Sequence, residues 1–278
     1  MDFRDDVNLD SSQVEDVGGR GGGGGGGFPG GAVIGGGGIV TLIVMVVVFV
    51  LNNLSGGDGR PAQQQPPSNL SQQCQTGKDA DQSEKCRVVG VVNSIQDYWK
   101  TEVSGYRPAK TILYSGGVRT ACGAADSSVG PFYCPGDQRV YLDLSFFDEL
   151  HSRFGAKGGP FAQAYVIAHE YGHHVQNLLG ALEGGSSVAT ELQADCFAGV
   201  WAKNAIDTGF YDKPFSRSEI AEALDAAAAV GDDRIQQRTG GRVDPDSFTH
   251  GSSAQRVNAF QEGYKTGRPV RCDTANLR

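Results

Sequence analysis

The sequence predicts an α+β fold that is mainly helical, contains a small β-sheet and is preceded by one transmembrane helix. Several long segments place apolar residues at helical spacing, and two short segments have the composition or alternation of strands. A run of about 20 uncharged residues near the N-terminus has the length of one membrane span. The 278 residues include 41 glycines that cluster near the N-terminus, so we expect the folded part to be shorter than the chain.

The N-terminal quarter is expected to anchor and tether the domain. Residues 1–31 are polar, acidic and then nearly pure glycine, which predicts disorder because too little apolar surface offsets the entropy of ordering. Residues 32–54 contain the uncharged run, which at about 1.5 Å per residue spans a hydrocarbon core of roughly 30 Å. Residues 55–73 are rich in Gly, Gln, Pro and Ser and are predicted to form a flexible linker. Residues 74–278 remain for the folded domain.

The apolar run has two interpretations. A cleaved signal peptide is one, but the preceding segment is long and acidic and no A-x-A-like cleavage site follows the run. We therefore predict an uncleaved anchor and a single-pass membrane protein. Arg4 and Arg20 precede the run and Arg60 follows it, which gives a slight preference for a cytoplasmic N-terminus. The domain is then expected on the extracytoplasmic side, periplasmic or extracellular.

The domain itself is expected to consist mostly of helices. Apolar residues recur at helix spacing over residues 87–102. Pro160 suits a first helical position and Gly180 a C-terminal cap, so they bound another helix over residues 160–179. Further helices are predicted over residues 187–208, from the capping box at Ser216 and Glu219 to Gly231, and over about residues 253–265. Short strands are predicted over residues 112–114 and 139–144.

Charge argues against nucleic acid as a partner. The formal net charge is −8, and the lysines and arginines form no block of the kind that follows phosphate groups. The acidity is expected mainly to favour solubility.

Six cysteines occur in the chain, and none lies in a CxxC pair. An even count without zinc-ribbon spacing favours disulfides and an oxidising compartment. Six unrelated reduced thiols are the alternative, because sequence alone does not fix connectivity. In chain order the cysteines fall into pairs: Cys74 and Cys86, Cys122 and Cys134, Cys196 and Cys272.

One segment has the pattern of a metal-binding helix, His169-Glu170-Tyr171-Gly172-His173. The two histidines are four residues apart, so their imidazoles project from one face and can bind one ion. Glu170 lies beside them, close enough to take a proton from water activated by the metal. The segment therefore predicts one Zn²⁺ ion with Glu170 as general base. A solvated polar helix face is the alternative.

The following predicted helix offers two carboxylates. Catalytic zinc needs a third protein ligand and leaves its fourth position open. Glu191 and Asp195 share one face of this helix at four-residue spacing, after a turn that can bring them back to the histidines. We assign Glu191 as the third ligand and Asp195 as the acceptor that orients a liganding histidine. A salt bridge from Asp195 to a surface cation is the alternative.

These motifs resemble known peptidases. The HExxH helix followed by an E-x-x-A-D helix is similar to the gluzincins. The wider pattern of a single anchor, HEYGHH, ELQADCFAG and THGSSAQR resembles the bacterial putative neutral zinc metallopeptidase family, over roughly residues 74–272. The resemblance implies a zincin-like α+β domain with the ligands His169, His173 and Glu191 and the catalyst Glu170. It also implies an edge strand, here residues 139–144, that aligns an extended peptide beside the metal.

Several other residues near these motifs have a structural or a functional interpretation. His250 resembles the downstream histidine with which thermolysin-type gluzincins stabilise the oxyanion, and a loop histidine that caps the last helix is the alternative. His174 is about 100° around the helix from His173, so packing or solvent exposure is expected. Tyr165 and Tyr171 are predicted core residues, and Arg256 is either a structural ion pair or a substrate clamp.

The predicted function is hydrolysis of peptide bonds by a membrane-anchored zinc-dependent metallopeptidase, with a peptide or protein as substrate. The alternative is a non-hydrolytic envelope scaffold or interaction module that zinc stabilises. A structural zinc site is normally closed by a fourth protein ligand. A free Cys196 bound to the metal would favour the scaffold.

Overall fold

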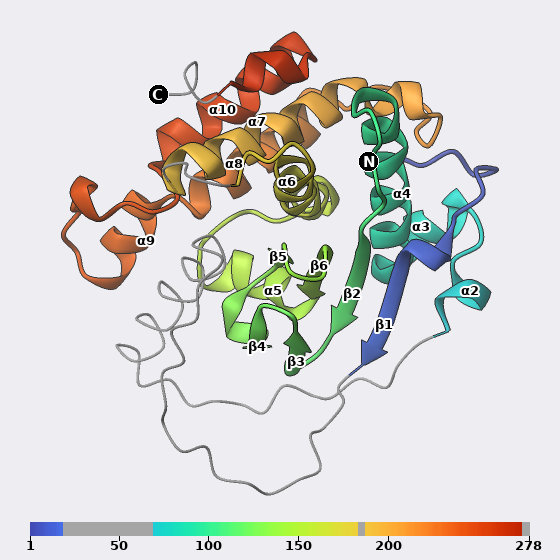
Figure 1. Ribbon diagram of the computed structural model, residues 1–278, viewed down its shortest axis with the longest axis horizontal. Helices are drawn as coiled ribbons and strands as arrows, with labels where there is room; N and C mark the ends of the chain where they lie inside the picture. The colour runs from blue at the N-terminus through green and yellow to red at the C-terminus, as the bar shows by residue number, and fades with distance from the viewer. Residues whose placement is uncertain (19–68, 183–186, 274–278) are drawn as a thin grey trace, which may run out of the picture.

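The computed structural model describes residues 1–18, 69–182 and 187–273, and in them a mixed β-sheet lies beneath a layer of helices (Figure 1). Its strands, in spatial order, are β1 (Val14–Gly18), β2 (Lys110–Tyr114), β6 (Arg139–Asp143) and β5 (Phe132–Cys134). The first three are parallel to one another, and β5 is antiparallel to β6. β1 and β5 are therefore the edge strands, and β5 lies at the edge that contacts helix α6 (Pro160–Leu178).

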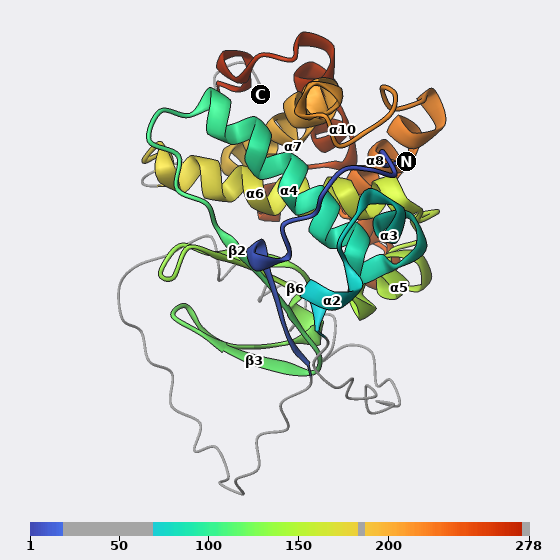
Figure 2. The same cartoon turned by 90° about the vertical axis from the view of Figure 1, so that its right-hand side faces the viewer.

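Both faces of the sheet are buried, because successive side chains of each strand point to opposite faces and apolar residues occur on both. Leu113, Val140 and Leu142 belong to the main core under the helices. Ile112 and Tyr141 alternate with them and belong to a second, smaller core. The hairpin of β3 (Gly117–Thr120) and β4 (Gly123–Asp126) contributes to this smaller core and lies on the side of the sheet away from the helices (Figure 2).

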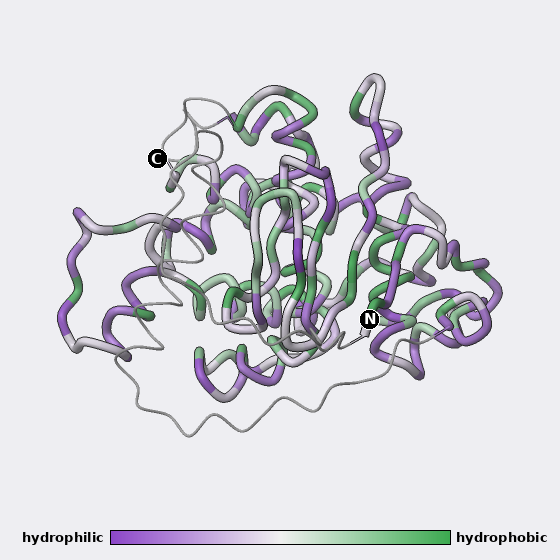
Figure 3. Tube along the Cα trace, turned by 60° about the horizontal axis from the view of Figure 1, so that its bottom comes forward, coloured by the Kyte–Doolittle hydropathy of each residue, from purple (hydrophilic) through white to green (hydrophobic). Residues whose placement is uncertain are grey.

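The helices largely follow the signals in the sequence. α4 (Glu84–Glu102) and α6 lie over the sheet (Figure 2), and α6 begins at Pro160 as predicted. Ser216 and Ser252 each form a capping box, at the start of α8 (Arg217–Ala229) and α10 (Ser253–Thr266). The other α-helices of the described residues are α2 (Leu70–Gln73), α3 (Gly77–Gln82), α5 (Ser145–Ser152), α7 (Ser187–Asn204) and α9 (Asp232–Thr239). α9 and the loop after it project from the body, and this segment is mostly hydrophilic (Figure 3).

The predicted disorder of residues 1–31 is wrong for residues 1–18, and the predicted domain boundary at Cys74 is too late. β1 pairs with β2, and the side chain of Asn93 accepts a hydrogen bond from the backbone of Asp10 at 2.8 Å and returns one at 3.0 Å. Phe3 is only 1% exposed. Its ring occupies the space above Gly90 on α4, where an added Cβ would lie 2.6 Å from the ring. Tertiary contacts therefore supply the burial that the local composition lacks.

The predicted membrane topology is also corrected. No helix among the described residues combines the length and apolar character needed to cross a bilayer. The run on which the transmembrane helix was predicted, within residues 32–54, lies outside the described residues, as does most of the predicted linker over residues 55–73. Because β1 and β2 belong to one sheet, residues 1–18 and 69–273 lie on the same side of any membrane. A cytoplasmic N-terminus with an extracytoplasmic domain is therefore wrong.

The predicted disulfides are confirmed in the order in which the cysteines occur. Cys74 bonds to Cys86, and Cys122 bonds to Cys134. The third bond, between Cys196 and Cys272, ties α7 to the segment after α10. No free cysteine occurs in the part of the chain that the structure describes.

Candidate active site

Three buried side chains from two neighbouring helices meet at one point. His169 and His173 project from α6, and Glu191 projects from α7. The Nε2 atom of His169 lies 3.1 Å from Glu191 Oε2, and the Nε2 atom of His173 lies 3.5 Å from Glu191 Oε1. One potential ligand atom from each residue lies within 4.8 Å of the others. The structure thus brings together the three residues that the sequence singled out as ligands.

The donor set and its spacing fit a zinc ion. A tetrahedral site with metal–ligand distances of about 2.0–2.2 Å places neighbouring ligand atoms roughly 3.3–3.6 Å apart. The two nitrogen–oxygen distances above, 3.1 and 3.5 Å, run to the two different oxygens of Glu191 and are close to that range. Two imidazole nitrogens and one carboxylate also match the donors of many catalytic zinc sites, which leave a fourth position for water or substrate.

Each histidine is oriented through its other ring nitrogen. The Nδ1 atom of His169 lies 2.8 Å from Asp195 Oδ1, and that of His173 lies 2.8 Å from Gln176 Oε1. Gln176 is itself held, because its amide donates to the carbonyl oxygen of Thr190 at 2.7 Å. Donation from both Nδ1 atoms directs each Nε2 atom at the cluster, where a bound metal would replace any proton on Nε2. Sequence reasoning missed Gln176, although its position three residues after His173 on the same helix was a local signal.

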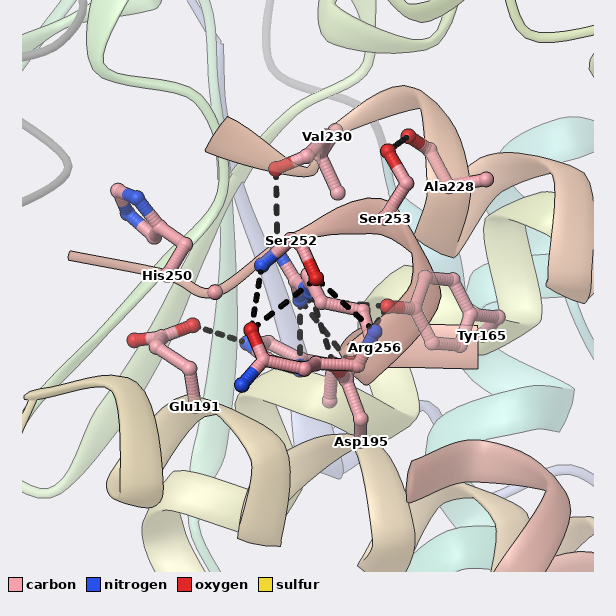
Figure 4. Close-up of polar contacts among 12 residues, drawn as sticks. Tyr165, Glu191, Asp195, Ala228, Val230, His250, Ser252, Ser253 and Arg256 are labelled. Carbon is pink, nitrogen blue, oxygen red and sulfur yellow. Dashed lines mark hydrogen bonds and ion pairs between the residues drawn. The ribbon is translucent and has the colours of Figure 1, made fainter. Parts of the chain in front are cut away.

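Asp195 is the centre of a second buried network (Figure 4). Arg256 on α10 donates from Nε to Asp195 Oδ2 at 2.8 Å and from Nη2 to Oδ1 at 3.0 Å. Tyr165 donates its hydroxyl to Asp195 Oδ1 at 2.5 Å. Of the two roles considered for Arg256, the structure therefore supports the ion pair. Tyr165 is buried as predicted, but its hydroxyl also belongs to the support of His169.

Burial and neighbouring charges have opposite effects on the pKa values of these groups. Burial alone would lower the pKa of His169, but the carboxylates of Asp195 and Glu191 raise it to about 10. Burial alone would raise the pKa of Asp195, but Arg256 and then His169 lower it to about 2. For Glu191, burial is likewise outweighed by the two histidines, which hold its pKa well below the usual value. Both carboxylates are therefore ionised in the folded protein, as a cation site requires.

A glycine lets the two ligand helices approach closely. A Cβ atom added to Gly172 on α6 would lie 2.9 Å from both Cα and the carbonyl oxygen of Ala194 on α7. A side chain at position 172 would therefore force α7 away. His169 and His173 on α6 and Glu191 on α7 flank this contact. The close approach of the two helices therefore sets the distance between the histidines and Glu191.

Glu170 and His250 border the same space without joining the cluster. Glu170 is 8% exposed, and burial raises its pKa against the lowering influence of His169 and His173. His250 lies near Glu191 (Figure 4), and its Nδ1 atom is 3.1 Å from Asp232 Oδ1. The other oxygen of Asp232 accepts the backbone N–H groups of residues 249–251 at 2.6–3.0 Å.

Asp232 was missed by sequence reasoning, because nothing local in the sequence links it to a histidine 18 residues away. Ser252 and Gln255 form the cap of α10, so the capping role considered for His250 is not the one observed. The ring of His250 instead borders the cavity that also contacts Glu170 and Glu191.

The predicted edge strand is wrong. Residues 139–143 form β6, which lies between β2 and β5, and β5 pairs with its residues 139–141. β5 is the edge strand on the side of α6, and Tyr133 in β5 contacts that helix. Its hydroxyl lies 3.0 Å from Nδ1 of His174. His174 is fully buried, and burial lowers its pKa to about 4, so the expectation of packing is confirmed.

Comparison with known proteins gives a consistent result. The sequence model of the family described as "Putative neutral zinc metallopeptidase" matches residues 1–275. The uncharacterized protein Rv2575 of Mycobacterium tuberculosis is 54% identical over 217 residues, which are 73% of this chain and 74% of the relative. The uncharacterized protein YpfJ of Escherichia coli K12 is 49% identical over 183 residues, which are 61% of this chain and 62% of the relative. No solved structure shows a significant match.

Proposed function

Because this chain belongs to the putative neutral zinc metallopeptidase family, we propose that it is a zinc-dependent peptidase with His169, His173 and Glu191 as ligands. The observation that carries the proposal is the buried cluster of these three side chains, with one donor atom of each within 4.8 Å of the others. When bound, a zinc ion in such a site lowers the pKa of water and polarises a carbonyl group.

Glu170 is the proposed general base. It follows His169 directly on α6 and borders the same cavity as His169 and Glu191. Its raised pKa suits a carboxylate that must take a proton and give it up again. In the proposed reaction Glu170 takes a proton from the attacking water and passes it to the amine that leaves.

β5 is the proposed guide for the substrate backbone. A peptide in an extended conformation can add to an exposed sheet edge through main-chain hydrogen bonds. β5 is an edge strand, and residues 129–131, which lead into it, border the cavity with Glu170. A peptide paired with β5 would therefore run past the metal ligands. The hydrogen bond between Tyr133 and His174 fixes β5 against the ligand helix.

His250 is the proposed donor to the oxyanion, with Asp232 as the residue that positions it. Donation of the Nδ1 proton to Asp232 leaves Nε2 to face a substrate. Protonation of that nitrogen makes it a donor to developing negative charge.

Replacing Asp232 with asparagine tests this role. We expect kcat to fall by about 10- to 100-fold with little change in KM or bound zinc, because the imidazole loses its ionised partner. The control is Asp246→Asn on the exposed loop, which should match the wild type. An unchanged kcat in Asp232→Asn would exclude the role.

The scaffold alternative gains no support from the structure. A free Cys196 would have been a candidate fourth ligand, but this residue is bonded to Cys272. Within the described residues the candidate metal cluster consists of His169, His173 and Glu191.

Metal analysis combined with cleavage of a peptide library tests the proposed function. The full chain should contain one zinc ion per molecule, lose activity with a chelator and regain it with added zinc. Glu191→Ala should weaken zinc binding by at least the roughly 10- to 100-fold that loss of an outer-shell partner causes. The control Glu149→Ala removes a partly exposed carboxylate that pairs with Arg153 and should leave zinc bound. Full zinc content without cleavage of any library peptide would contradict the proposal.

A further inference from the structure

A chain of hydrogen bonds leads from His173 to the C-terminal segment of the domain. The Nδ1 atom of His173 lies 2.8 Å from Gln176 Oε1, and the amide nitrogen of Gln176 donates to Gln193 Oε1 at 3.0 Å. The amide nitrogen of Gln193 in turn donates to the backbone carbonyl oxygen of Cys272 at 2.8 Å. Gln193 is partly exposed, and the other three residues are buried. The chain therefore connects a proposed metal ligand to a backbone group near the end of the described residues.

Cys272 is held against α7 at two points. Gln193 and Cys196 are three residues apart on α7, so they project from neighbouring positions on one side of the helix. Gln193 binds the carbonyl oxygen of Cys272, and Cys196 forms the disulfide with its sulfur. Both cysteines are fully buried. The disulfide thus keeps the carbonyl oxygen within reach of Gln193.

The direction of every hydrogen bond in this chain follows from its last member. A backbone carbonyl oxygen can only accept, so Gln193 must turn its amide nitrogen to Cys272 and its amide oxygen to Gln176. Gln176 donates to that oxygen, which turns its own oxygen toward His173. An oxygen there accepts the proton on Nδ1 and directs Nε2 at the cluster. The carbonyl oxygen of Thr190, 2.7 Å from the amide nitrogen of Gln176, favours the same orientation.

The two histidines differ in how much they need such a chain. His169 is oriented by the carboxylate of Asp195, which can accept at either of its oxygens. His173 is oriented by the neutral amide of Gln176, which presents an oxygen on one side and a nitrogen on the other. An amide therefore needs further partners to fix which atom faces the imidazole.

We propose that Gln193 is a positioning residue for His173. Through Gln193, the disulfide between Cys196 and Cys272 sets the affinity of the site for zinc. The proposal rests on the proposed zinc site and adds a contribution of the C-terminal segment to it. Without the disulfide, the carbonyl group of Cys272 can move away, and the amide of Gln193 loses the partner that fixes its orientation. Gln193 can then turn its nitrogen to Gln176, where two donors oppose each other and the support of His173 is weakened.

Zinc affinity, measured by competition with a chromophoric chelator, tests the role of Gln193. Gln193→Leu should weaken zinc binding about 10-fold, the lower end of the range for outer-shell partners, because Thr190 still holds Gln176. The d–d absorption bands of the cobalt-substituted protein should change as well, because they respond to the geometry of the ligands. The control is Gln163→Leu on α6. Gln163 is also partly exposed, and its side chain donates one hydrogen bond to α4 and accepts another from it.

Removal of the disulfide tests the connection to the C-terminal segment. Cys196→Ala combined with Cys272→Ala should weaken zinc binding by a similar factor, but should have little further effect when Gln193→Leu is already present. The control is Cys74→Ala combined with Cys86→Ala, which removes the disulfide between the end of α2 and α4 and should leave zinc affinity unchanged. Denaturant unfolding of each zinc-free variant is measured in parallel. A merely structural role would lower stability without changing the zinc affinity of the folded protein.

The outcomes separate this proposal from the proposed function. Wild-type zinc affinity in Gln193→Leu, which keeps all three disulfides, would overturn the proposal and leave the zinc site standing. Additive effects of Gln193→Leu and disulfide removal would overturn the connection through Gln193.

If the wild type binds no zinc, the proposed function fails, and NMR of the zinc-free protein decides the support by itself. The side-chain amide protons of Gln176 should then exchange with solvent faster after removal of the Cys196–Cys272 disulfide than after removal of the control disulfide. Equal exchange in the two variants would exclude the support.

Discussion

Replacing Glu170 with glutamine is expected to lower kcat by about 10²- to 10⁴-fold while leaving zinc bound, because the general base is lost. Glutamine has nearly the same shape as glutamate but cannot accept the proton of the attacking water. The three proposed ligands keep their own supports, because Asp195 and Gln176 contact the histidines and not Glu170. Turnover should be measured with the best peptide from the library, and zinc by elemental analysis of the same preparation.

The matched control for this change is Glu102→Gln, which alters an exposed carboxylate at the end of α4. It should have wild-type turnover and zinc content. Retained turnover in Glu170→Gln would remove the residue from the mechanism. Joint loss of zinc and turnover would instead give Glu170 a structural role in the cluster.

Removing residues 1–18 is expected to abolish the folded state. The deletion exposes the edge of β2 and leaves the side chain of Asn93 without its two backbone partners at Asp10. It also empties the site of Phe3, and loss of a buried phenylalanine side chain alone costs about 3–5 kcal/mol. Because whole domains are stable by only about 5–15 kcal/mol, the sum should exceed what the fold can lose.

A milder variant makes this prediction quantitative. Phe3→Ala should lower the free energy of unfolding by about 3–5 kcal/mol in denaturant titrations of the full chain. Glu15→Ala on β1 is the control, because Glu15 is exposed on the same strand and its loss should change stability by less than about 0.5 kcal/mol. A deletion variant that unfolds cooperatively at the wild-type midpoint would show that β1 is dispensable.

The residues of the metal cluster could be predicted from the sequence because their arrangement is mostly local. Four-residue spacing on a helix dictates that His169 and His173 share a face, whatever the rest of the fold does. The same argument applies to Glu191 and Asp195 on the next helix. The bounds of both helices also follow from local signals, such as Pro160 at the start of α6.

The positions of other parts of the site depend on contacts between segments that are distant in the sequence. Asp232 meets His250 only because the start of α9 lies against the loop before α10. β5 takes the edge of the sheet because it pairs with β6 alone, and no pattern within either strand states which of them has a free edge.

The sequence by itself determined which side chains can form the cluster, because this follows from residue type and local spacing. Only the tertiary structure decided that residues 1–18 belong to the domain. Val14–Gly18 contains two acidic residues and leads into a glycine-rich segment, so its own composition does not predict a strand. Its partner β2 lies more than 90 residues away in the chain. Strand formation there depends on hydrogen bonds and burial that only the assembled sheet supplies. The predicted membrane topology was wrong because it separated residues 1–18 from the domain, whereas β1 pairs with β2.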